Sequence, residues 1–168
     1  MLDAQGLEAY GLRLLYGRAM SIGELTEKLK RRAETPTDID TVLTKLKQYR
    51  FLDDRKYADT LAASRKENQG IGKARVLREL QQRRVAPALA KESVEKAYSG
   101  TDEVTMIEAF LKRKFRNVKM AEYLAEEKHL ASAYRKLIYS GFSSSNSIKV
   151  LKSYAERAED LEDSELES

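Results

Sequence analysis

Few residues of this 168-residue chain have the type and spacing that catalysis requires. The single histidine, His129, follows Glu126 and Glu127, but a zinc site needs several ligands and no second imidazole is present. We therefore interpret His129 as an exposed residue at a helix start. Asp53 and Asp54 form a carboxylate pair, yet no acid–base partner accompanies them, and helix capping explains both.

A short glycine-rich stretch, "QGIGKAR", contains Gly70 and Gly72 and is weakly similar to a phosphate-binding loop. It lacks the terminal Gly-Lys-Ser/Thr, and no strand precedes it, so a turn between helices explains it better. Because the chain has no cysteine, disulfides and thiolate metal sites are excluded, and a reducing compartment is expected. The sequence therefore predicts no catalytic group, no metal site and no cofactor.

Basic side chains are the remaining candidates for function. Lys and Arg number 31 against 27 Asp and Glu, and the final stretch, "ERAEDLEDSELES", is strongly acidic, with seven Asp and Glu against one Arg. The rest of the chain is therefore more basic than the net charge of +4 indicates, which favours an acidic partner, nucleic acid first. A solvated helix surface is the alternative interpretation. The residues predicted to bind a partner or nucleic acid are Lys28, Arg31, Arg32, Lys73, Arg75, Arg78, Arg83, Arg84, Lys112, Arg113 and Arg116.

Helices must position these side chains, because apolar residues recur at helical spacing and no stretch alternates as a strand would. The motif "SIGE" predicts a capping box, in which Ser21 and Glu24 each satisfy a backbone amide at a helix start. Thr37 or Asp38 is expected to cap the helix after it. Residues 116–128 are expected to be helical from Ala121, either as an extension of a helix or within a loop.

An apolar frame recurs three times along the chain. The segments that begin at Ser21, Gly72 and His129 are 51 and then 57 residues apart. Their equivalent apolar positions are Leu25, Val76 and Ala133, then Leu29, Leu80 and Leu137, then Val85 and Phe142 in the later two segments. With a helix before and after each frame, the pattern predicts three tandem three-helix units, 1–52, 53–100 and 101–160, followed by a disordered acidic tail at 161–168. Because each unit is too small to bury much apolar surface, neighbouring units must share contacts.

The stretch "FLDD" lies at the junction of the first two units. If Asp53 caps the helix that follows, Leu52 and Tyr57 have the spacing of a hydrophobic staple. Phe51 would then close the preceding helix hairpin. We expect Leu52 and Tyr57 to be largely buried between successive units.

Tyrosines are spread along the chain, and we interpret them as packing residues rather than platforms for nucleic-acid bases. The residues concerned are Tyr49, Tyr57, Tyr98, Tyr134, Tyr139 and Tyr154. At the N-terminus, Asp3 and Glu8 interrupt the pattern of a signal peptide, and no segment has the roughly 18 uncharged apolar residues of a membrane span. These features predict a cytoplasmic protein without membrane contact, and we expect a monomer.

The middle of the chain carries a specific pattern, "FLDDRKYADTLAASR" followed by "GIGKARVLRELQQRRV". In it, an aromatic–Leu–Asp–Asp opening precedes a glycine-rich turn and a helix with a basic end. This pattern resembles the RecX family of regulators of the RecA recombinase. The matching positions are Phe51, Leu52, Asp53, Asp54, Tyr57, Ala58, Gly70, Gly72, Arg75, Val76, Glu79, Leu80, Arg83 and Arg84. Lys73 departs from the family, many members of which have proline there, and so does Ala33, near which the first unit often has glycine.

The resemblance implies an all-α fold of three three-helix units in an elongated, curved array. It also implies a non-enzymatic protein of DNA repair and recombination that binds the RecA–DNA filament, inhibits or modulates its recombinase and ATPase activity, and binds single- or double-stranded DNA weakly. The helices alone leave a second possibility, a helix-turn-helix transcription factor that reads bases in the major groove. Three units without an evident dimer element suit palindromic sites poorly.

Overall fold

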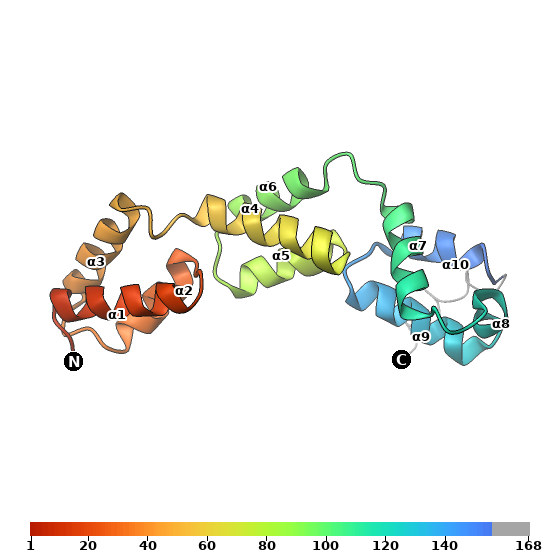
Figure 1. Cartoon of the computed structure of the whole chain (residues 1–168), viewed down its shortest axis with the longest axis horizontal. Coiled ribbons are helices and arrows are strands. Elements are labelled where there is room, and N and C mark those ends of the chain that lie inside the picture. Colours follow the sequence, from red (N-terminus) through yellow and green to blue (C-terminus); the bar gives the residue numbers. More distant parts are fainter. Residues whose placement is uncertain (156–168) are drawn as a thin grey trace. The chain divides into compact units, whose positions relative to one another are not determined.

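The structure is a computed structural model that describes residues 1–155 of the chain, and every regular element in that range is a helix (Figure 1). About 73% of the described residues are helical, which confirms the predicted all-α class. The elements are α1 (Ala4–Gly17), α2 (Ile22–Lys30), α3 (Pro36–Gln48), α4 (Asp54–Ser64), the π-helix η1 (Arg65–Gln69), α5 (Lys73–Gln82), α6 (Pro87–Tyr98), α7 (Glu103–Lys114), α8 (Met120–Leu124), α9 (Glu127–Tyr139) and α10 (Ser144–Lys152). The predicted acidic tail at 161–168 lies outside the described residues.

Side-chain caps begin several of these helices. The capping box at the start of α2 is confirmed: the Ser21 hydroxyl accepts from the amide of Glu24, whose carboxylate accepts from the amide of Ser21. The predicted cap of α3 is wrong. Thr35 is the N-cap, because Pro36 fits the first helical position and Asp38 completes a second capping box from inside the helix.

The described chain divides into two compact units. One comprises residues 1–62 and 78–96, and the other comprises residues 63–77 with those from 97 onward. The boundary passes through α4 near its end and through the middle of α5, so the predicted unit 53–100 contributes helices to both. The three-unit boundaries and the curved array stay predictions.

In the first of these units, α1, α2 and α3 pack on one another around a single apolar core. The repeated frame lies at its centre, with Leu25 and Leu29 fully buried. Leu2 extends this core by pairing its backbone with the end of α2: its amide donates to Arg32 O at 2.6 Å, and its carbonyl accepts from Glu34 N at 3.0 Å.

In the second unit, α10 packs against α7 and α9, and α8 packs against α9. Its core contains Ala133 and Leu137, again fully buried at the frame positions, and Phe110 meets Phe142 edge to face at 5.5 Å between ring centroids. The undecided segment 116–128 contains the short helix α8, whose Leu124 reaches this core.

The frame is confirmed by burial in all three segments, since Val76 and Leu80 of α5 are also fully buried. The later two segments close with a residue in the left-handed region, Arg84 with φ of 61° and Gly141 with φ of 92°. At both places the next amide bonds back to the helix: Val85 N donates to Leu80 O, and Phe142 N donates to Leu137 O.

Candidate functional site

The junction stretch ties two helices with two adjacent carboxylates. Asp53 caps its own helix, because its Oδ1 accepts from the amide of Lys56 at 3.1 Å. The Oδ1 of Asp54 instead accepts from the amide of Ile22 at 2.8 Å, so it caps α2, which precedes it by about 30 residues. Leu52 is buried in the core formed by α1, α2 and α3. The pair therefore links the middle repeat to the first.

Of the predicted junction residues, Tyr57 is less buried than expected, and Phe51 closes the hairpin only in part. The Phe51 side chain is 46% exposed, so only its backbone closes the hairpin, through its amide's bond to Leu46 O at 2.9 Å. Tyr57 is half-buried, and its hydroxyl forms hydrogen bonds with Glu24 and Arg83 instead of lying in the apolar core. Its position at the helix start lets it face α2 and the end of α5 together.

A chain of polar contacts runs from Arg18 to Arg83 within the first unit. The Arg18 guanidinium is 3.0 Å from Glu24 Oε1, and the Tyr57 hydroxyl donates to Glu24 Oε2 at 3.5 Å. Arg83 donates to the Tyr57 oxygen at 3.2 Å and pairs with Glu79 at 3.0 Å. Charge is balanced along this chain, so its residues hold the helices together.

The pKa values of the acidic groups follow from these contacts. Burial acts to raise the pKa of Glu24, but the bond from Arg18 and the Ser21 amide outweigh it and lower the pKa below its ordinary value of 4.5. For Asp54, burial dominates over the bond from the Ile22 amide and raises the pKa above 3.8. Burial also raises the pKa of Tyr57.

A backbone carbonyl accepts a hydrogen bond from a distant residue at the end of each of the three helices that carry the apolar frame, α2, α5 and α9 (the frame helices). The Ser21 hydroxyl donates to the carbonyl of Arg83, and the Gly72 amide donates to the carbonyl of Ser140 at 2.8 Å. Arg32 occupies the equivalent position of the first frame, and its carbonyl accepts from the Leu2 amide. The start of one frame helix thus abuts the end of the next frame helix. At the end of the first frame helix, α2, Leu2 makes the equivalent contact.

Close approach of two backbones explains the glycines in this contact. A Cβ on Gly72 would lie 2.6 Å from Phe142 N and closer still to the Gly141 carbonyl. A Cβ on Gly23 would lie 2.6 Å from the Cβ of Arg84. The Gly72 amide is already bonded to Ser140, so the phosphate-loop reading of "QGIGKAR" has no support in the geometry.

The predicted binding residues differ in exposure. Seven are exposed at the surface: Arg31, Arg32, Arg78, Arg84, Lys112, Arg113 and Arg116. Four are half-buried: Lys28, Lys73, Arg75 and Arg83. Binding through Arg75, Arg78 and Arg83 requires that their shared face be exposed. This is wrong for Arg83, which is held in the polar chain above, and for Arg75, which lies on an aromatic ring.

The structure brings some of these cations together and separates others. In the first unit, Glu27 lies 3.1 Å from Lys30 and 3.9 Å from Arg84, and the charges of these residues and Arg31 lower its pKa. This gathers the ends of α2 and α5 into one basic cluster. In the second unit, Arg113 donates to Gln69 O at 3.3 Å, where the left-handed Gly70 ends η1.

Two tyrosines that the sequence suggested as packing residues are at the surface. Tyr49 is 64% exposed and Tyr139 is 68% exposed, whereas Tyr98 and Tyr134 are buried as expected. The guanidinium of Arg75 lies 4.9 Å from the centroid of the Tyr139 ring. One sequence signal could have drawn attention to Tyr139: the stretch 128–155 contains five Lys and Arg and no Asp or Glu.

The catalytic and metal candidates do not assemble into a site. His129 is not exposed as predicted, because its ring stacks on Tyr123 with centroids 4.0 Å apart and its Nδ1 lies 3.1 Å from Tyr123 O. Within residues 1–155, no group of three or more His, Asp or Glu side chains could hold a metal ion. Nor is any described helix both long and apolar enough to cross a membrane.

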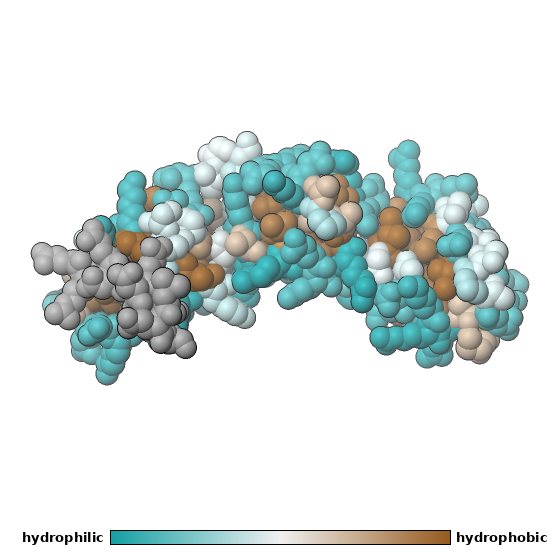
Figure 2. Space-filling model, turned by 180° about the vertical axis from the view of Figure 1, so that it is seen from behind, coloured by the Kyte–Doolittle hydropathy of each residue, from teal (hydrophilic) through white to brown (hydrophobic). Residues whose placement is uncertain are grey.

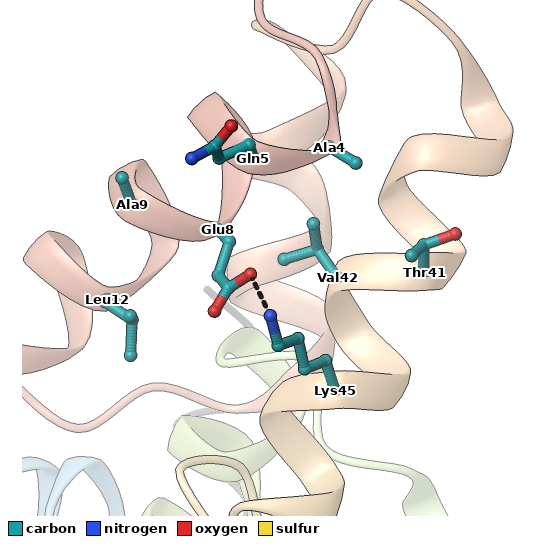
Figure 3. A pocket seen from close by; sticks show the side chains of 8 residues that line it. All are labelled: Ala4, Gln5, Glu8, Ala9, Leu12, Thr41, Val42 and Lys45. Carbon is teal, nitrogen blue, oxygen red and sulfur yellow. Dashed lines mark hydrogen bonds and ion pairs between the residues drawn. The ribbon is translucent and has the colours of Figure 1, made fainter.

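A groove of about 560 Å³ lies between α1 and α3 in the first unit (Figure 3). Figure 3 shows Glu8 and Lys45 facing each other across it, with Nζ 2.6 Å from Oε2. The bond to Glu8 raises the pKa of Lys45, so the lysine is charged and already paired. Its remaining lining is largely apolar, with Gln5 and Thr41 as the other polar side chains. On the face that Figure 2 shows, hydrophilic residues cover most of the surface.

Comparison with known proteins places these features in a family. Residues 53–94 match the family model described as RecX, second three-helix domain. The regulatory protein RecX of Herminiimonas arsenicoxydans is 32% identical over 109 residues, which cover 65% of this chain and 70% of that protein. RecX of Halorhodospira halophila is 38% identical over 86 residues, and the chain spans about half the length of this relative and of RecX from Deinococcus radiodurans.

The fold agrees with that assignment. The crystal structure of RecX from Lactobacillus salivarius superposes with a TM-score of 0.68 at 15% identity, covering 90% of this chain and 96% of that one. The matched residues 53–94 include the Asp53–Asp54 opening, the Gly72 contact and the frame residues of α5. The residues that match the family are therefore ones whose structural roles are described above. The chain belongs to the RecX family.

Proposed function

We propose that the protein is a non-enzymatic regulator that binds the RecA–DNA filament and inhibits its recombinase and ATPase activity. Membership of the RecX family, whose curated members are named regulatory proteins, is the observation that carries this proposal. The exposed cations of α2, α5 and the end of α7 support it, because phosphates or acidic filament side chains would be attracted to them.

Within the first unit, the candidate binding surface is the basic cluster at the ends of α2 and α5. Arg31 and Arg84 are exposed, and Glu27 holds the region together without neutralising it. The positions follow the last turn of a helix, where backbone carbonyls favour positive side chains and keep them extended toward solvent. Binding through such cations weakens as salt rises.

A regulator that acts by binding needs no reacting group. The candidate acids and bases serve structure: Asp53 and Asp54 cap helices, and Glu24 and Glu79 pair with arginines. We propose that the protein acts as a monomer that contacts the filament and, more weakly, DNA.

The test is inhibition of ATP hydrolysis by RecA on single-stranded DNA. Replacing Arg31, Arg78 and Arg84 together by Glu should abolish inhibition while leaving the helical signal intact, since all three are exposed. Arg83 is left unchanged because its loss would break the contacts to Tyr57 and Glu79. Inhibition by the folded triple variant at the level of the parent would refute the proposal.

A matched control carries the same charge change elsewhere. Arg13, Lys56 and Lys91 are also exposed and lie on α1, α4 and α6, and replacing them by Glu should leave inhibition close to that of the parent. If this control loses inhibition equally, total charge and not the α2–α5 cluster is responsible. Tight binding of one duplex sequence without RecA would instead favour a helix-turn-helix transcription factor.

A further inference from the structure

The pair formed by Arg75 and Tyr139 is the feature of the second unit that the proposed regulatory role does not explain. Tyr139 is the last residue of α9 and is 68% exposed. The Arg75 guanidinium lies 4.9 Å from the ring centroid, which is the geometry of a cation–π contact. With so much of the residue exposed, Arg75 covers only part of the ring, and an aromatic surface stays open to solvent.

Backbone bonds on both sides hold this pair in place. Next to Tyr139, the Ser140 carbonyl accepts from the Gly72 amide at 2.8 Å, and next to Arg75, the Ala74 amide donates to Gly141 O at 3.2 Å. Gly141, with φ of 92°, permits this approach, because a Cβ there would meet the backbone of Arg75. The backbones that carry the ring and the guanidinium are therefore set by the fold, which reduces the backbone entropy lost when a ligand binds.

The charge around the pair is positive. The stretches 68–78 and 128–155 contain no Asp or Glu, and both run through this place. Arg135 lies one turn before Tyr139 on the exposed side of α9, and Lys73 begins α5 beside Gly72. Two acidic residues begin α7 at this end of the unit: the Glu103 carboxylate accepts from Ser143 and Asn146, and the Asp102 carboxylate accepts from Thr105.

An open aromatic ring beside a guanidinium, surrounded by lysine and arginine, suits a base with its phosphates. Single-stranded nucleic acid presents free base faces, whereas a duplex stacks them internally. An acidic peptide would be attracted by the charge but gains little from the ring. We propose that Tyr139, with Arg75 on its ring, is a stacking platform for a base of single-stranded nucleic acid, and that Lys73 and Arg135 bind the adjoining phosphates.

The platform deepens the proposed function, in which DNA is a partner, and it is tested without RecA. The probe is a fluorescently labelled oligothymidine, and the measurement is anisotropy over a salt series. Tyr139→Ala should weaken binding about tenfold with an unchanged salt slope, because a stacked base and no phosphate contact is lost. Tyr139→Phe should bind like the parent. Arg135→Gln should weaken binding and reduce the slope of log K against log salt by about the amount that one phosphate contact contributes.

Tyr16→Ala is the matched control, because Tyr16 is 82% exposed in the other unit and its loss should leave oligothymidine binding unchanged. The platform is refuted if Tyr139→Ala binds within about twofold of the parent, or if Tyr139→Ala and Tyr139→Phe weaken binding equally. It is also refuted if polyglutamate displaces oligothymidine from the parent but not from Tyr139→Ala, which would identify an acidic peptide as the occupant.

Parallel ATPase assays keep the two proposals separate. If the parent binds oligothymidine through Tyr139 yet fails to inhibit RecA, the regulatory proposal falls and the platform stands. If the parent inhibits RecA and the Tyr139 substitutions leave oligothymidine binding unchanged, the platform is refuted and the regulatory proposal is retained.

Discussion

Replacing Gly72 by Ala tests the backbone contact on which both the repeat arrangement and the Arg75–Tyr139 pair depend. The added Cβ would lie 2.6 Å from Phe142 N and closer to the Gly141 carbonyl, whereas unbonded heavy atoms prefer about 3.5–4.0 Å. The obstructing atoms are backbone, so they cannot rotate away as a side chain could. Either α5 or the α9–α10 turn must move.

The expected magnitude comes from two contributions. Overpacking of a closely packed site costs about 1–3 kcal/mol. Displacing the Gly72 amide from Ser140 O, now 2.8 Å away, removes a bond with a net contribution of about 0.5–1.5 kcal/mol. We therefore expect Gly72→Ala to lower the free energy of unfolding by about 2–4 kcal/mol, which corresponds to a fall in Tm of roughly 10 °C for a chain of this size.

Urea unfolding followed by circular dichroism at the helical band measures this change. Gly17→Ala is the control, since a Cβ there meets nothing within 4 Å, and removing a helical glycine should be neutral or stabilise by up to about 1 kcal/mol. A Gly72→Ala variant as stable as the parent would show that the two backbones do not approach as closely as described.

Three other predictions concern the stability of the fold and its dependence on pH. Leu52→Ala should cost about 2–4 kcal/mol because Leu52 is buried in the α1–α3 core, while Asp53→Ala should cost about 1 kcal/mol through the lost cap; equal costs in chemical denaturation would contradict this. Val76→Glu should unfold the second unit, since an unpaired charge would be buried, and a native helical spectrum would disprove it. Glu24→Gln and Asp54→Asn should show opposite pH dependences in unfolding titrations. Because the folded pKa of Glu24 is lowered, the parent's advantage over Glu24→Gln is full above pH 4.5 and shrinks as pH falls through the folded pKa. Because the folded pKa of Asp54 is raised, the parent gains stability relative to Asp54→Asn as pH falls toward 3.8, and parallel curves for the two variants would refute both assignments.

Periodicity was sufficient to predict the helices and the frame. Leu25, Val76 and Ala133 occupy equivalent positions, and all are fully buried, because a 3.6-residue period fixes which face of the helix turns inward. The capping box at Ser21 was equally readable, since it is local. At α3 the predicted cap, Thr37 or Asp38, was wrong, although Pro36 at the first helical position indicates Thr35 as the N-cap.

The candidate site was less predictable because its contacts join residues far apart in sequence. Asp54 caps α2 and not its own helix, and only the folded chain brings Ile22 to it. The pairing of Arg83 with Glu79 was readable from their i,i+4 spacing, but its bond to Tyr57 was not. Tyr139 has helical spacing that suits packing, yet its side chain is exposed at the end of α9.

The regulatory proposal is tested most directly by co-sedimentation with RecA filaments assembled on single-stranded DNA, compared with the same DNA alone. We predict that the parent pellets with the filament far more than with naked DNA, less so at high salt, and that the variant with Arg31, Arg78 and Arg84 replaced by Glu stays in the supernatant. Equal pelleting of the parent with filament and naked DNA, or undiminished pelleting of the folded variant, would contradict the account.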